Sequence, residues 1–221
     1  MIQAILWDIG GPINDETEQE ALFDDAALAA ARSLRDVSAE EYVAICQRAV
    51  ESFAPKAYKF IMWELAGHDM AVYEQIRELL QESDFERFNV RPEIPEVLAA
   101  LSSRYKLGLA ANSGAAMIDR LTEHDLLQYF TSQKPGAVIG LAKPDVRYYL
   151  HVLEELDVRP EQAVMIGDRV DCDVVPAKLL GMKTVLYRVG RHKDQQPRSP
   201  EEIPDAQIDN VTQLDKVLEQ W

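Results

Sequence analysis

The spacing of hydrophobic and polar residues divides the chain into stretches of different character. Ile5, Leu6 and Trp7 form an apolar run that predicts a buried strand, and a Gly-Gly-Pro turn follows shortly after it. Between residues 17 and 83 the apolar residues recur at helical spacing, and no stretch has a convincing strand pattern. We expect helices here at 17–36, 38–54, 57–69 and 70–83, with Ser38 as the cap of the second.

From Pro92 onward, strand patterns and helix patterns alternate. We expect strands at 106–111, 163–168 and 183–188 and helices at 94–105, 115–125, 145–156 and 173–181. Pro176 lies inside the last of these helices, so that helix should start late or bend. The charged stretch 191–205 predicts a surface loop before a final short strand and helix. Such alternation is typical of a parallel sheet with helices on both faces.

The predicted organisation is therefore an α/β core of residues 1–14 and 88–221, into which an all-helical domain of residues 15–87 is inserted. Asp8, Asn112 and Asp168 each lie at the end of a predicted strand. In open parallel sheets, ligands bind beyond the carboxyl ends of the strands. We therefore expect these three side chains to converge on one site.

Composition and charge narrow the possible partners. The chain has 221 residues, 47% of them hydrophobic, which is enough for a full core. Its formal net charge of -15 repels phosphate backbones and argues against nucleic-acid binding. No apolar run approaches the roughly 20 residues that span a bilayer, and the first residues do not resemble a secretion signal. We expect a cytoplasmic protein without membrane or nucleic-acid partners.

Four short motifs occur in a fixed order along the chain. They are "WDIGG" at 7–11, "LAANSG" at 109–114, "AKPD" at 142–145 and "IGDRVDCD" at 166–173. Each residue taken singly has an ordinary explanation as a turn former, a helix cap or a surface charge. Together with the helical insertion, however, the motifs resemble the haloacid dehalogenase superfamily of hydrolases, most of which are phosphatases. The resemblance covers essentially the whole chain and implies a Rossmann-like parallel sheet with a helical cap domain.

The resemblance assigns a catalytic centre to these motifs. Asp8 resembles the family nucleophile, which forms an aspartyl-phosphate that water then hydrolyses. Lys143 resembles the lysine that neutralises this aspartate and the transferring group. Mg²⁺ is the implied cofactor, held by Asp8, the backbone oxygen of Gly10, Asp168 and Asp173, because hard cations prefer oxygen ligands.

The same resemblance implies a place for the substrate. Gly11, Asn112 and Ser113 are the expected substrate-binding residues, with backbone N–H groups of the two turns directed at phosphate oxygens. The cap would exclude water and select the substrate, which we expect to be a small phosphorylated metabolite. The sequence specifies neither the substrate itself nor the oligomeric state.

Two positions depart from the family pattern. Gly10 occupies the place where many family phosphatases carry a second aspartate, the general acid that protonates the leaving group. General acid catalysis is typically worth about 10²- to 10⁴-fold. Asp15 and Glu16 are candidate substitutes, although acids are also common at helix starts. Ala111 stands where the family usually has a serine or threonine, so Ser113 would have to supply that hydroxyl.

Three hypotheses therefore stand at this point. A Mg²⁺-dependent phosphomonoesterase is favoured, because the nucleophile, the lysine and the metal-binding acids are all present. A carbon–halogen hydrolase would use Asp8 to displace halide and would need no metal. A catalytically impaired member would bind a phosphorylated ligand or a protein, since a fold alone does not settle function. The changes at Gly10 and Ala111 favour this last hypothesis, and the complete charged set counts against it.

Overall fold

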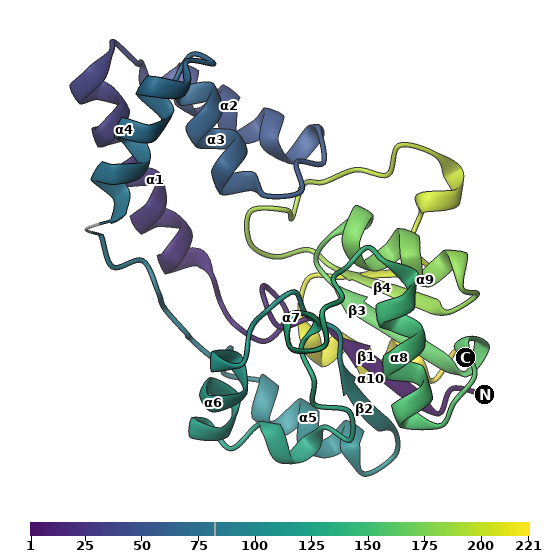
Figure 1. Cartoon of the computed structure of the whole chain (residues 1–221). Coiled ribbons are helices and arrows are strands. Elements are labelled where there is room, and N and C mark those ends of the chain that lie inside the picture. The colour runs from purple at the N-terminus through teal and green to yellow at the C-terminus, as the bar shows by residue number, and fades with distance from the viewer. Residues whose placement is uncertain (82) are drawn as a thin grey trace. The chain divides into compact units, whose positions relative to one another are not determined.

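The computed structural model of this chain describes residues 1–81 and 83–221. The chain divides into two compact units, which Figure 1 shows coloured along the sequence. Residues 1–15 and 88–221 form one of them, which we call the larger unit, and residues 16–87 form the other, the helical unit. The helical unit is thus an insertion between the first strand of the larger unit and the rest of it.

A five-stranded parallel sheet forms the centre of the larger unit. Its strands are β1 (Ala4–Trp7), β2 (Lys106–Leu109), β3 (Ala163–Gly167), β4 (Lys183–Tyr187) and β5 (Ala206–Ile208), in the order β2-β1-β3-β4-β5. Trp7 at the end of β1 pairs with Leu109 on one side and Ile166 on the other. The carboxyl ends of β1, β2 and β3 are therefore neighbours, and the predicted parallel α/β sheet is confirmed.

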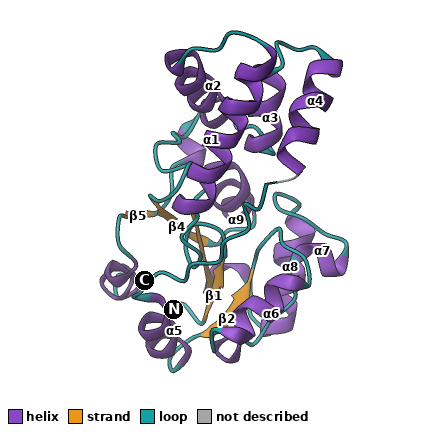
Figure 2. Ribbon diagram, turned by 90° about the vertical axis from the view of Figure 1, so that its left-hand side faces the viewer, coloured by secondary structure: helices purple, strands orange, loops and turns teal. Residues whose placement is uncertain are grey.

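Helices cover both faces of this sheet, as the orange strands among the purple helices of Figure 2 illustrate. Ile5 and Trp7 face a core built with α5 (Ile94–Ser102), α6 (Ala116–Glu123) and α10 (Leu214–Leu218). Ala4 and Leu6 face the opposite core with α8 (Val146–Leu156) and α9 (Val175–Leu179). Successive side chains of a strand alternate between faces, so a strand covered on both sides is apolar throughout. Each large side chain buried in this way contributes roughly 1.5–3 kcal/mol.

The helical unit has a hydrophobic core of its own. Its helices are α1 (Thr17–Leu34), α2 (Ala39–Glu51), α3 (Ala57–Leu65) and α4 (Met70–Gln81). Buried residues of all four helices, such as Phe23, Ile45, Ile61 and Ile76, belong to one cluster. Ser38 is the N-terminal cap residue of α2, as predicted, because its side chain accepts a hydrogen bond of 3.0 Å from the Glu41 N–H. The helix expected at 70–83 includes residue 82, which lies outside the described residues.

The helix expected at 173–181 has a different form. A π-helix spans Val170–Val174, and α9 begins only at Val175. Proline has no N–H, so Pro176 cannot donate to the carbonyl of Cys172 four residues earlier. That carbonyl instead accepts a hydrogen bond from the Tyr149 hydroxyl of α8. The α-helical part therefore starts later than position 173, whereas helical backbone begins earlier, at Val170, as a π-helix. Such wide turns are often found at functional sites.

Several short elements were not predicted from the sequence, because three or four residues are too few to show a period. They are α7 (Gly136–Ile139) and the 3₁₀ helices Leu127–Tyr129, Pro160–Gln162, Pro200–Glu202 and Val211–Gln213. The surface loop predicted at 191–205 is wrong at Gln195, which is only 1% exposed, and at Pro204, which is also buried. None of the helices in the described part of the chain has the length and apolarity needed to cross a bilayer.

Candidate active site

Three buried carboxylates gather at the carboxyl ends of β1 and β3. Asp8 directly follows β1 and Asp168 directly follows β3, and these two strands are neighbours in the sheet. Asp173 comes from the π-helix that follows. One oxygen of each carboxylate lies within 4.8 Å of the other two. The topology of the sheet thus brings together residues from both ends of the sequence.

Lys143 lies among these acids. Its Nζ is 2.8 Å from Asp8 Oδ2 and 2.6 Å from Asp173 Oδ1, and its side chain is 3% exposed. Burial alone would lower the pKa of this lysine, but Asp173 and Asp8 outweigh burial and raise the pKa above its ordinary value. Lys143 is therefore a charged ammonium group. Because three carboxylates face one ammonium, the cluster keeps an excess of negative charge.

Asn112 holds the backbone of Lys143 in place. This asparagine follows the end of β2, and its Oδ1 accepts a hydrogen bond of 2.6 Å from the Lys143 N–H. Its Nδ2 donates in turn to the Lys143 carbonyl at 2.9 Å. The Lys143–Pro144 peptide bond is cis, and Asp145 then caps α8 by accepting from the Arg147 N–H at 2.9 Å. Both ends of the Asn112 amide are therefore used to position the lysine.

The loop after Asp8 is built to lie close to the other acids. The Ile9 N–H donates to Asp8 Oδ1 at 2.8 Å. Gly11 has a left-handed backbone with φ of 81°, and a Cβ added there would lie 3.0 Å from the Asp168 side chain. The Gly11 N–H donates to the Asn14 carbonyl at 3.0 Å. Glycine at position 11 is thus favoured by the left-handed backbone and by the close approach of Asp168.

A second glycine makes room for Asp173. A Cβ on Gly167 would lie 2.1 Å from the Asp173 carboxyl carbon, so the acid could not reach its observed position beside a larger residue. Asp173 Oδ2 accepts a hydrogen bond of 3.0 Å from the Arg169 N–H. Complete burial raises the pKa of Asp173 above its ordinary range, while Lys143 opposes that rise.

The residues around Ala111 include one side-chain hydroxyl, that of Ser113. The Ala111 N–H donates to the Tyr148 hydroxyl oxygen at 3.0 Å. Ser113 Oγ is buried and has no hydrogen-bond partner among the described residues. An unpartnered buried hydroxyl is costly, and a ligand oxygen at this point would satisfy it.

The predicted substitutes for the missing acid can be placed in part. Asp15 belongs to the larger unit, and its Oδ2 lies 3.2 Å from Nη1 of Arg91. Arg91 also donates from Nε to the Gly11 carbonyl at 2.6 Å. Asp15 therefore takes part in holding the loop that follows Asp8. Glu16 belongs to the helical unit.

Outside the motifs, a buried glutamine supports the turn that carries Asp173. Gln195 Oε1 accepts a hydrogen bond of 2.7 Å from the Val170 N–H, at the start of the π-helix. Its Nε2 faces Asp171 Oδ1 at 3.4 Å, and the guanidinium of Arg169 pairs with the same carboxylate at 2.7 Å. Nothing in the local sequence of this loop marks Gln195, because a single buried polar residue has no period.

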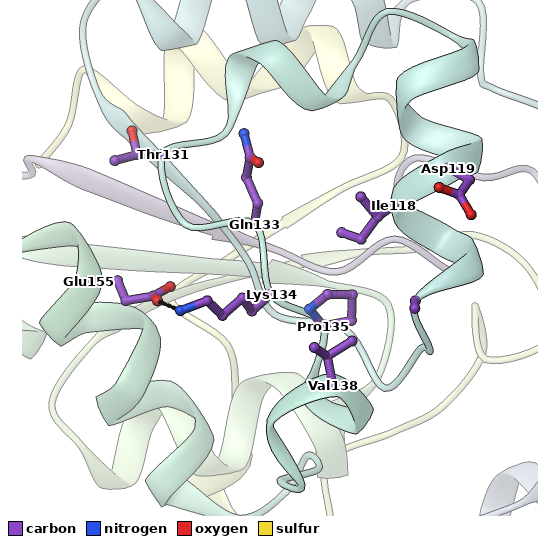
Figure 3. A pocket seen from close by; sticks show the side chains of 9 residues that line it. Ile118, Asp119, Thr131, Gln133, Lys134, Pro135, Val138 and Glu155 are labelled. Carbon is purple, nitrogen blue, oxygen red and sulfur yellow. Dashed lines mark hydrogen bonds and ion pairs between the residues drawn. The ribbon is translucent and has the colours of Figure 1, made fainter.

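A hollow in the larger unit is separate from the charged cluster. It has a volume of about 660 Å³ and lies between α6, the segment 131–138 and α8 (Figure 3). The described residues that line it are Ala115, Ile118, Asp119, Thr131, Gln133, Lys134, Pro135, Val138 and Glu155. Lys134 Nζ and Glu155 Oε1 form an ion pair of 2.5 Å across it. The four charged side chains of the cluster are not part of this lining.

The family model of haloacid dehalogenase-like hydrolases matches residues 2–181 of the chain. This chain belongs to that family. The predicted superfamily and the predicted hydrolase activity are thereby confirmed.

Relatives of this chain include proteins named as phosphatases. A glyceraldehyde 3-phosphate phosphatase of Methanopyrus kandleri is 26% identical over 97% of this chain and 96% of its own. A phosphoglycolate phosphatase of Aquifex aeolicus is 27% identical over 99% of this chain and 97% of its own. The solved structure of a 2-haloacid dehalogenase from Pseudomonas syringae has a TM-score of 0.61 at 23% identity, covering 100% of both chains. This last likeness shows the shared fold alone.

Proposed function

We propose that this chain is a Mg²⁺-dependent phosphatase that hydrolyses small phosphorylated metabolites through a phosphoryl intermediate on Asp8. The supporting observation is the position of the Lys143 ammonium, within 2.8 Å of both Asp8 and Asp173, beside a third acid at the same strand ends. Displacement of halide needs a nucleophilic carboxylate but no such set of further acids. The phosphatases among the full-length relatives point the same way.

The donor set of the site fits Mg²⁺. Three carboxylates within 4.8 Å of one another offer hard oxygen ligands, which Mg²⁺ prefers to nitrogen and sulfur. We assign Asp8, Asp168, Asp173 and the Gly10 carbonyl as its ligands. When bound, the ion neutralises the excess negative charge that would otherwise repel a phosphate dianion.

In this proposal each residue of the cluster has one task. Asp8 supplies the carboxylate oxygen that bonds to phosphorus, and the Ile9 N–H holds the other oxygen at 2.8 Å. Lys143 stabilises negative charge on Asp8 and on the transferring group. Water then attacks the phosphorus of the intermediate, which releases phosphate and restores the carboxylate.

Substrate binding is proposed for Ser113, Gly11 and Asn112. Ser113 has the strongest support, because its buried Oγ lacks a partner among the described residues. The Asn112 side chain already holds Lys143, so its contribution to the substrate would come from its peptide N–H. The Gly11 N–H already donates to Asn14, so the role predicted for Gly11 stays a prediction.

We further propose that the helical unit acts as the cap that selects the substrate. The two full-length relatives differ in the phosphorylated compound that their names state, so we propose only the class of substrate, a small phosphorylated metabolite. The net charge of -15 supports a small ligand over a nucleic acid, because long-range repulsion opposes polyanions.

The test is hydrolysis of p-nitrophenyl phosphate by the purified chain, with Mg²⁺ and with a chelator. We expect turnover that requires the metal and is abolished by Asp8→Asn. Asp157→Asn, the same chemical change at an exposed residue with a left-handed backbone, should keep full activity. Calorimetry should show Mg²⁺ binding that Asp168→Asn weakens at least about tenfold, because one anionic ligand is lost. Equal turnover by Asp8→Asn, or turnover unaffected by the chelator, would contradict the proposal.

A further inference from the structure

The turn that follows β4 carries three cationic side chains and a histidine that have no role in the proposed function. They are Arg188, Arg191, His192 and Lys193. Strand β4 pairs in parallel with β3, and Leu186 lies beside Gly167. The turn therefore leaves the sheet at the same edge as Asp168, which directly follows Gly167.

This turn is held in one conformation by the residues around it. Gly190 has a left-handed backbone with φ of 60°, and its carbonyl accepts a hydrogen bond of 3.3 Å from the Lys193 N–H. The Arg188 guanidinium donates from Nη1 to the carbonyls of Lys193 and Gln195. Gln195 in turn joins the end of the turn to the π-helix through the Val170 N–H. The side chains on the turn are thus presented by a fixed backbone.

His192 lies in this turn with one ring nitrogen unsatisfied. The ring is largely buried, and its Nδ1 has no hydrogen-bond partner among the described residues. A buried polar atom without a partner is unfavourable, and where a native fold contains one, a water or a bound ion is a common partner. The structure therefore has room for a further hydrogen bond at His192 Nδ1.

The charges around this nitrogen favour a negatively charged partner. Burial and the nearby charges of Arg169 and Arg191 lower the pKa of His192, so the ring is neutral at pH 7. Asp171 opposes this effect, but its carboxylate is held by the Arg169 guanidinium at 3.0 and 2.7 Å. Two guanidinium groups and one carboxylate leave an excess of positive charge beside a neutral ring. A neutral imidazole with its proton on Nδ1 can donate a hydrogen bond there.

We infer that Arg169, Arg191 and His192, which we call the arginine–histidine cluster, bind an oxyanion, either a carboxylate or a phosphate group. His192 Nδ1 donates a hydrogen bond to this group, and the guanidinium of Arg191 contacts its oxygens. Guanidinium groups match carboxylate and phosphate oxygens in shape and charge. In a chain with a net charge of -15, a local excess of positive charge is where small anions collect.

The position of the cluster indicates what could carry the oxyanion. Arg169 directly follows Asp168, and its N–H donates to Asp173 Oδ2 at 3.0 Å, so the cluster adjoins the proposed metal ligands. In the sheet, β4 stands two strands from β1, which at about 4.8 Å per strand places their ends about 10 Å apart. If the proposed phosphatase function holds, a substrate with its phosphoryl group at Asp8 can reach the cluster with a second anionic group several bonds from phosphorus. The other source is a free oxyanion from solution.

The first test is a titration with sulfate, followed by NMR of the four histidine rings. Chloride keeps the ionic strength constant, and no Mg²⁺ is added. We expect a saturable shift of the His192 ring resonances, which are assigned by their absence from His192→Gln. The resonances of His124, an exposed residue, should not move.

A matched pair of variants tests the role of Arg191 in this titration. Arg191→Gln removes a charge-assisted contact and should weaken the sulfate affinity reported by His192 about ten- to a hundredfold. Arg159→Gln, the same change at a side chain that is 73% exposed, should bind sulfate like the unaltered chain.

The second test determines whether the substrate supplies the oxyanion. Inhibition of p-nitrophenyl phosphate hydrolysis is measured for alkyl phosphonates of increasing chain length that end in a carboxylate. Alkyl phosphonates of the same lengths that end in a methyl group are the controls. A carboxylate that reaches the cluster should lower the inhibition constant about ten- to a hundredfold, at the longer lengths only. Arg191→Gln should remove this advantage.

The outcomes separate this inference from the proposed function. A carboxylate advantage that depends on Arg191 assigns the oxyanion to the substrate, and a sulfate shift without such an advantage assigns it to a free anion. If sulfate leaves the His192 resonances unmoved and the carboxylate gives no advantage, the inference is overturned and the phosphatase proposal is unaffected. A sulfate affinity that is equal in Arg191→Gln and the unaltered chain also overturns it. If p-nitrophenyl phosphate is not hydrolysed, the proposed function fails, and the sulfate titration still decides whether the cluster binds an oxyanion.

Discussion

His192 should make the stability of this protein fall at mildly acidic pH. Its ring is largely buried, and Nδ1 has no hydrogen-bond partner among the described residues. Burial, helped by the nearby charges of Arg169 and Arg191 and opposed by Asp171, lowers the pKa of His192 from 6.5 to about 4. The perturbation is His192→Gln, which removes the titration and keeps a polar side chain.

The sign and size of the effect follow from proton linkage. Below about pH 6.5 the unfolded chain binds a proton at this residue that the folded chain refuses, so the free energy of unfolding falls as the pH falls. Most of the loss occurs between pH 6.5 and the folded pKa of about 4. Between pH 7.5 and 5.0 the contribution of His192 is about 2 kcal/mol.

The assay is equilibrium unfolding by urea at pH 7.5 and at pH 5.0, followed by circular dichroism. Carboxylates also titrate in this range, so the informative quantity is the difference between the two proteins. His192→Gln should lose about 2 kcal/mol less than the unaltered chain on going to pH 5.0. His124→Gln, at an exposed position of the larger unit, should behave like the unaltered chain. Equal losses in His192→Gln and the unaltered chain would refute the reasoning.

Three further predictions concern the supports of the site. Asn112→Ala removes two hydrogen bonds from the peptide of the site lysine, and at about 0.5–1.5 kcal/mol each we expect kcat/KM for p-nitrophenyl phosphate to fall about ten- to a hundredfold. An unchanged value would show that the lysine needs no such clamp. Gly167→Ala puts a methyl group 2.1 Å from the Asp173 carboxyl carbon, so Mg²⁺ affinity measured by calorimetry should drop at least about tenfold. Gly114→Ala, where nothing lies within 4 Å, is the control, and equal affinity in both variants would contradict the crowding argument. Gln195→Leu leaves a buried N–H without its acceptor and should cost about 1–3 kcal/mol in urea unfolding. An unchanged free energy of unfolding in Gln195→Leu would argue against this bond as a source of stability.

The sequence by itself determined the architecture of this protein. The apolar run before Asp8 indicates a strand buried on both faces, and the alternation of strands and helices after Pro92 is typical of a parallel sheet covered by helices. Adjacent parallel strands end at the same edge of the sheet. Acidic residues that directly follow β1 and β3 in the sequence are therefore expected to lie close together. The predicted meeting of Asp8 and Asp168 depends on local patterns and one topological rule, and it was therefore accessible without coordinates.

The tertiary structure alone decided how the site is held together. The clamp from Asn112 to Lys143 and the bond from Gln195 to Val170 join residues 31 and 25 positions apart, and such pairs leave no periodic trace in a sequence. The π-helix that presents Asp173 lies beside Pro176 and a hydroxyl from another helix, which binds the carbonyl that the proline cannot. Local patterns specify which face of an element is buried. The partner that a buried polar group finds depends on the packing of the whole fold.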